Sequence, residues 1–229
     1  MAPSTEPQTL ATGATYSPAT GRWQLLPAFP LPDISGATVT ADSAVWTGSS
    51  LVVVANYGQV APPADRIVAL AKKQTVAVKW RPGWTSWRII SHAPTRIGGQ
   101  LTGGLWTGSR LVLAESNITA DVAPQPIPGP HTFDVAARRW LPIPLADIQT
   151  YPRKTAWTGQ AVFALSLGGG QASAFNPSTD AWIPLPRPPD PIYTTIVWTG
   201  HEILVLGEGT TAGGPKGPNR AEAFVPSNA

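Results

Sequence analysis

The residues of this chain that could do acid–base or metal chemistry are few and scattered. Its 229 residues include three histidines, 13 acidic residues and no cysteine. His92, His131 and His201 lack a second ligand at the spacing that zinc sites use. We find no G-x-S-x-G nucleophile motif, no P-loop and no G-x-G-x-x-G after a strand. The sequence therefore predicts no catalytic residue, no metal site and no cofactor.

A repeated tripeptide indicates which elements would position any site. Trp-Thr-Gly begins at Trp46, Trp106, Trp157 and Trp198, and an apolar run follows each copy after two or three residues. The copies are spaced by about the length of one supersecondary unit, which is typical of a repeat array.

A second signature is in phase with the first. An aromatic residue is followed seven residues later by tryptophan in the pairs Tyr16 and Trp23, Trp80 and Trp87, Phe133 and Trp140, and Phe175 and Trp182. Turn-forming residues between the two members predict a hairpin. Each repeat is thus predicted to have four strands: a ends at the Trp of Trp-Thr-Gly, b is the apolar run, c holds the aromatic residue, and d starts at the second Trp.

The predicted b strands are apolar at nearly every position, most clearly in 51–55 and 203–206. Such strands are expected to be buried on both faces, as happens when small sheets stack face to face around an axis. We therefore predict an all-β protein, a β-propeller of four-stranded antiparallel blades in a single domain over 1–229. The repeats are centred on 46–87, 106–140, 157–182 and 198–224.

The run from Tyr16 to Pro27, YSPATGRWQLLP, together with the W-T-G-x-x-L-V-V pattern, resembles the kelch-type β-propellers of the galactose-oxidase-like group, in a variant common in bacterial proteins. The resemblance covers essentially the whole chain. The glycine doublet of kelch repeats is clear only at 168–170, so the match is to a divergent member. The resemblance implies a fold and a habit of binding, but no ligand. The copper-radical oxidases of this group use a Cys crosslinked to Tyr, which a chain without cysteine lacks.

The strand count leaves two arrangements open. Residues 16–27 form a c/d hairpin at the start of the chain, and the last repeat stops in its c strand at Phe224. Either the segment Arg22–Pro27 supplies the missing d strand and closes a four-bladed ring, or the chain is a piece of a longer propeller whose open edges allow self-association.

The function predicted from this topology is a binding or scaffold module. The b-to-c and d-to-a connections share one face and vary between repeats, as in 56–75, 116–131 and 207–220, and variable loops on a rigid repeat are where binding usually resides. We expect a protein or glycan ligand there. Candidate ligand-binding residues are Tyr57, Arg66, Arg96, His131, Arg153 and Tyr193.

The alternative is a propeller-type hydrolase or lyase acting on carbohydrates or peptides. It would need carboxylates that converge at the axis about 5 to 9 Å apart. The candidates, all in or near variable loops, are Asp33, Asp42, Asp121 and Asp190.

Composition excludes other classes of partner. The net charge is +3, with basic pairs that are separated in sequence, so we predict no nucleic-acid surface. No apolar run reaches the length of a membrane span. Residues 1–14 are expected to be disordered or extended and have no signal-peptide core. A cytoplasmic protein and a mature secreted domain both fit.

Overall fold

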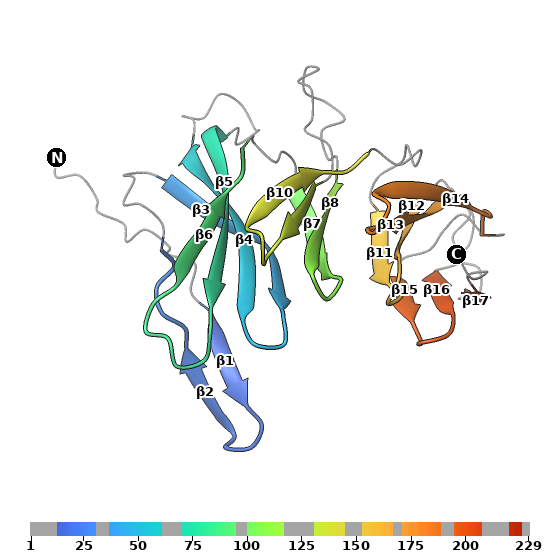
Figure 1. Ribbon diagram of the computed structural model, residues 1–229. Helices are drawn as coiled ribbons and strands as arrows, with labels where there is room; N and C mark the ends of the chain where they lie inside the picture. The colour runs from blue at the N-terminus through green and yellow to red at the C-terminus, as the bar shows by residue number, and fades with distance from the viewer. Residues whose placement is uncertain are drawn as a thin grey trace, which may run out of the picture. The chain divides into compact units, whose positions relative to one another are not determined.

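In the computed structural model of the chain, every regular element of the described residues is a β-strand, as predicted (Figure 1). The chain divides into two compact units, Met1–Ile97 and Gly98–Ala229. No helix in the described part is long and apolar enough to cross a membrane. The structure describes residues 13–30, 37–60, 70–94, 100–116, 131–144, 153–166, 171–188, 195–207 and 220–225.

Unit 1 holds a two-stranded hairpin and a four-stranded sheet, both antiparallel with consecutive strands side by side. The hairpin, drawn in blue in Figure 1, projects beyond one end of the sheet. Of the predicted N-terminal segment 1–14, all but the last two residues lie outside the described residues. The strands are β1 (Ala14–Ser17) and β2 (Arg22–Leu25) in the hairpin, and β3 (Ala37–Trp46), β4 (Leu51–Val60), β5 (Leu70–Trp80) and β6 (Arg88–His92) in the sheet.

Unit 2 holds two four-stranded sheets and one three-stranded sheet, again antiparallel meanders. The first sheet contains β7 (Gln100–Trp106), β8 (Arg110–Ser116), β9 (His131–Asp134) and β10 (Arg139–Pro142). The second contains β11 (Arg153–Trp157), β12 (Val162–Ser166), β13 (Ala172–Asn176) and β14 (Ala181–Leu185), and the third contains β15 (Thr195–Trp198), β16 (Ile203–Gly207) and β17 (Arg220–Phe224). The prediction of repeated four-stranded antiparallel sheets is confirmed. The predictions of a single domain and of a ring closed by residues 16–27 stay predictions.

Both sequence signatures have a structural role. The first strand of each sheet ends at the Trp of Trp-Thr-Gly. In three of the four pairs of the second signature, the aromatic residue and the Trp are direct cross-strand partners, as in Phe133 with Trp140 and Phe175 with Trp182. Their ring centroids are 4.6 Å and 5.2 Å apart. Such cross-strand aromatic pairs stabilise a hairpin beyond the area that they bury.

The Trp-Thr-Gly motif forms the same tight turn each time. The threonine hydroxyl donates a hydrogen bond to the carbonyl three residues later, at 3.1 Å from Thr107 and 3.0 Å from Thr158. The glycine has a positive φ, 94° at both Gly108 and Gly159, which side-chain-bearing residues rarely adopt. The repeated tripeptide is therefore explained by turn geometry.

The core of unit 2 lies between sheets. The whole of β12 is buried, and its side chains alternate between the two faces of the sheet. Phe163 and Leu165 pack in one cluster with Ile203 of β16. Val162 packs in another with Val112 of β8. The middle sheet is thus covered on both faces by its neighbours, as predicted for its b strand. In β16 the same prediction is wrong for one face, because Ile203 and Val205 are buried but Leu206 is 40% exposed.

Gly159→Ala tests the turn geometry. A β-carbon at Gly159 meets no atom within 4 Å, so the cost is the backbone strain of a positive φ alone. We expect the free energy of unfolding to fall by about 1–2 kcal/mol, measured by urea denaturation followed by tryptophan fluorescence. The neighbouring exposed Gln160→Ala is the control and should cost under about 0.5 kcal/mol. Equal stabilities of the two variants would refute this account of the motif.

Candidate functional site

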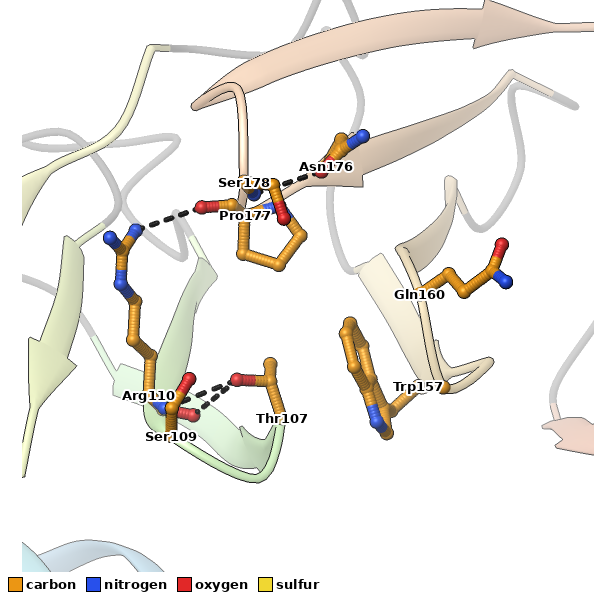
Figure 2. Close-up of a pocket in the computed structure, with 9 residues that line it drawn as sticks. Thr107, Ser109, Arg110, Trp157, Gln160, Asn176, Pro177 and Ser178 are labelled. Carbon is orange, nitrogen blue, oxygen red and sulfur yellow. Dashed lines mark hydrogen bonds between the residues drawn. The ribbon is translucent and has the colours of Figure 1, made fainter.

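Three short turns of unit 2 surround a hollow of about 540 Å³ (Figure 2), which we call the Trp157 notch. The β7–β8 turn comes from one sheet, and the β11–β12 and β13–β14 turns come from the next. The notch is lined by Thr107, Ser109, Arg110, Trp157, Gly159, Gln160, Asn176, Pro177 and Ser178.

Arg110 fixes the two sheets at the notch. Its Nη1 donates to the Pro177 carbonyl at 3.0 Å and to Oδ1 of Asp180 at 3.0 Å, a contact that is also an ion pair (Figure 2 shows the first bond). Asp180 has a φ of 51°, which aspartate tolerates in turns better than most residues do. Because its side chain is 52% exposed, the ion pair contributes little to stability. The ion pair places the carboxylate of Asp180 beside the positive charge of Arg110, which lines the notch.

A tryptophan side chain forms a second hydrogen bond between these sheets. Nε1 of Trp182 donates to the Pro144 carbonyl at 2.8 Å. In unit 1, Nε1 of Trp87 donates to the Pro27 carbonyl, also at 2.8 Å. In both cases the acceptor lies four residues after the Trp of the preceding hairpin. The d strand of one repeat is thus bonded to the segment that leaves the repeat before it.

The notch offers hydrogen-bonding groups around an aromatic ring. The indole of Trp157 stands between Thr107 and Gln160 in Figure 2. The exposed side chains of Ser109, Gln160 and Ser178 make no hydrogen bond within the described residues. The described residues that line the hollow include neither an acidic residue nor a histidine. This set of side chains can form hydrogen bonds with a polar ligand.

A larger hollow of about 830 Å³ lies in unit 1, between the β1–β2 hairpin and the end of the β3–β6 sheet. Five aromatic side chains line this hairpin groove. Tyr16 is 50% exposed, Trp23 71% and Trp46 50%. The guanidinium of Arg88 lies 4.2 Å from the ring centroid of Trp84, in cation–π geometry. Like the Trp157 notch, the groove is lined by short turns and by the Trp of a Trp-Thr-Gly motif.

Tyr57, proposed from the sequence as a loop residue, is a core residue of unit 1. The connection expected over 56–75 is shorter at both ends, because β4 continues to Val60 and β5 begins at Leu70. The side chain of Tyr57 is 5% exposed, and its hydroxyl donates to Oε1 of Gln74. Burial raises the pKa of the Tyr57 phenol above its ordinary value.

The other sequence-predicted residues are placed only in part. His131 is buried in β9, where its backbone lies opposite Leu113 and Pro142. Arg153 begins β11, opposite Ser166. Arg66, Arg96 and Tyr193 lie outside the described residues, as do Asp33, Asp121 and Asp190 of the hydrolase alternative, whereas Asp42 lies in β3. The six binding candidates stay a prediction.

The sequence prediction places binding on the variable connections, so it does not include the residues of the Trp157 notch, which lie at or beside short repeated turns. One signal could have indicated them. The residue after the Trp-Thr-Gly glycine is always polar and varies between repeats: Ser49, Ser109, Gln160 and His201. Variation at one fixed position of a rigid turn is typical of recognition.

Comparison with known proteins adds no further identification. No protein-family model matches the chain, and no curated protein is significantly similar to it.

Trp182→Phe tests the tie between sheets. The substitution keeps an aromatic ring opposite Phe175 but removes the donor to the Pro144 carbonyl. We expect a loss of about 1–2 kcal/mol in unfolding free energy in urea denaturation, and a similar loss for Trp87→Phe. Trp46→Phe, at a half-exposed ring, should cost under about 0.5 kcal/mol. If all three variants lost the same amount, the indole hydrogen bonds would have no special role.

The raised pKa of Tyr57 predicts a pH dependence of stability. The folded state holds the phenol proton to higher pH than the unfolded state, so this contribution is complete below pH 10 and is lost as the pH rises above it. We expect unfolding free energies measured between about pH 8 and pH 11 to fall less steeply for Tyr57→Phe than for the parent chain. Tyr16→Phe controls for the loss of one phenol. Identical slopes for the parent chain and Tyr57→Phe would contradict the assignment.

Proposed function

We propose that this chain is a non-catalytic binding module of the kelch-type β-propeller class, and that it binds a neutral glycan. The propeller class is supported by the repeated four-stranded antiparallel sheets and by the face-to-face packing of neighbouring sheets in unit 2. The recurrence of one turn and one aromatic pair supports the kelch type. A repeat scaffold of this kind presents side chains from rigid elements.

The observation that carries the glycan proposal is the composition of the Trp157 notch. An indole face can stack on the C–H groups of a sugar ring, while amides and hydroxyls bond its hydroxyl groups. The notch combines Trp157 with Gln160, Ser109 and Ser178, and its volume of about 540 Å³ falls within the range of small-molecule sites. The charge of Arg110 is paired with Asp180, which favours a neutral ligand.

The same lining supports binding over hydrolysis. Glycoside hydrolysis requires two carboxyl groups on either side of the scissile bond, in most families. Among the described residues that line the Trp157 notch and the hairpin groove, none is an aspartate or glutamate.

The test is a titration with methyl glycosides of glucose, galactose, mannose and N-acetylglucosamine and with their β-linked trisaccharides. Saturation-transfer NMR would detect binding, and intrinsic fluorescence would give the affinity. We expect saturable binding that weakens at least tenfold in Trp157→Ala, about 1.4 kcal/mol, and three- to tenfold in Gln160→Ala. Ser49→Ala, at the same turn position of the first repeat, is the matched control. If no glycoside binds the folded chain, the glycan proposal is wrong, and unchanged affinity in Trp157→Ala would move the site elsewhere.

A further inference from the structure

The hairpin groove of unit 1 is built largely from aromatic rings. Tyr16 and Trp23 come from the β1–β2 hairpin, Trp46 ends β3, and Trp80 and Trp84 lie at the end of β5 and in the turn that follows it. The groove encloses about 830 Å³, which is within the range of ligand-binding sites. A hollow of this size with several aromatic faces can contact more than one ring of a ligand at a time.

Hydrogen bonds and ring packing hold both walls of the groove. On the side of the sheet, Nε1 of Trp80 donates to the Trp84 carbonyl at 3.0 Å, which fixes the β5–β6 turn to the strand before it. On the side of the hairpin, Nε1 of Trp87 donates to the Pro27 carbonyl at 2.8 Å, just after β2. Phe29 packs on the same indole, with ring centroids 5.3 Å apart. Because the walls are held in this way, a ligand would order little of the protein on binding, which lowers the entropic cost.

The charge around these rings is positive. Arg22 lines the groove, and the guanidinium carbons of Arg88 and Arg81 lie 4.2 Å and 5.7 Å from the ring centroid of Trp84. Within the described residues, none of these three arginines forms an ion pair. Unit 1 contains eight lysines and arginines against four aspartates and glutamates, whereas unit 2 contains eight against nine. The net positive charge of the chain therefore belongs to the unit that holds the groove, which favours an anionic ligand.

The other side chains of the groove favour one kind of anionic ligand. Ser17, Gln24 and Thr85 place hydroxyl and amide groups among the rings, and such groups form hydrogen bonds with sugar hydroxyls. Binding the phosphate backbone of a nucleic acid would require a stripe of lysines and arginines along the groove. Among the described residues that line it, Arg22 is the one basic residue. The lining therefore matches a polysaccharide with acidic groups better than it matches a nucleic acid.

We propose that the hairpin groove is a second binding site of this chain and that it binds an acidic polysaccharide. Sugar rings stack on the indoles of Trp23 and Trp46, which are 71% and 50% exposed. The planar guanidinium of Arg22 donates paired hydrogen bonds to a carboxylate or sulfate group of the polymer. The two arginines beside Trp84 add attraction at longer range. The groove lies in unit 1 and the Trp157 notch lies in unit 2, so this inference is independent of the neutral-glycan proposal.

The first experiment titrates the full chain with hexasaccharides of equal length and measures binding by calorimetry. Oligogalacturonate carries carboxylates, sulfated maltohexaose carries sulfates, and maltohexaose is the neutral probe. We expect at least one acidic probe to bind about tenfold more tightly than maltohexaose, and its affinity should fall as NaCl is raised from about 20 to 200 mM. The tighter of the two acidic probes identifies the anionic group that the groove recognises. Failure of both acidic probes to bind, or tighter binding of a thymidine hexanucleotide, would overturn the inference.

A matched pair of arginine variants tests whether the acidic probe binds in the groove. Arg22→Gln removes the charge but keeps hydrogen-bonding groups, and it should weaken binding about fivefold and reduce the dependence on salt. The control is Arg139→Gln, because Arg139 also directly precedes the Trp of its aromatic pair and is exposed, but lines neither hollow. Equal losses in the two variants would mean that net charge alone attracts the probe, and the proposed site would be wrong.

Tryptophan variants test the stacking and separate the two binding proposals. Trp46→Ala removes a half-exposed ring and should weaken binding of the acidic probe about tenfold. Trp23→Ala makes the same test on the hairpin wall, so the test survives if one variant fails to fold, as judged by circular dichroism. Trp157→Ala removes the ring of the notch and should leave this affinity unchanged. A loss in Trp157→Ala with none in Trp46→Ala and Trp23→Ala would place the acidic probe in the notch and overturn the inference.

Discussion

Unit 2 is built around a second strand, β12, whose two faces must both be covered. In β12 every side chain is buried, with Phe163 and Leu165 on one face and Val162 and Ala164 on the other. Burying an apolar side chain of this size contributes about 1.5–3 kcal/mol. In an isolated sheet both of these faces would be exposed to water. For the middle sheet of unit 2, stacking against a neighbour on each side provides this cover.

Apolar contact alone does not fix how stacked sheets align, because it is nearly independent of direction. The ties that fix the alignment are hydrogen bonds at the sheet ends. The bond from Trp182 to Pro144 joins the fourth strand of one sheet to the segment leaving the sheet before it, and the bond from Arg110 to Pro177 joins two turns. If the sheets slide past one another, both of these hydrogen bonds break and each carbonyl loses its donor. A carbonyl left without a partner costs more free energy than the hydrogen bond contributes. The Trp157 notch is formed between sheets held in this way.

Much of this fold could be predicted from the sequence, because its signals are local. The ends of the first strands follow from Trp-Thr-Gly, and the hairpins follow from the aromatic pairs. The extent of β4 and β5 could not be predicted, because the polar residues Asn56 and Thr75 end the apolar runs and so indicate the start and end of a connection. Both are buried, and Oγ1 of Thr75 donates to Oδ1 of Asn56 across the ladder. Because the two polar side chains satisfy each other, both strands continue past them. Tyr57 therefore lies within β4 and is a core residue.

The candidate site was harder to predict than the fold for a related physical reason. The threonine hydrogen bond and the positive φ of the glycine already account for the repeated sequence of the Trp-Thr-Gly turn, so the repeat by itself does not indicate a ligand. The same constraints hold the residue after the glycine in a fixed backbone geometry, whatever its side chain. A ligand that meets Gln160 or Ser109 there orders little backbone on binding, which reduces the entropic cost of recognition. The repeats therefore provide equivalent rigid positions with different side chains, and a binding surface can vary along the chain without change to the turns that support it.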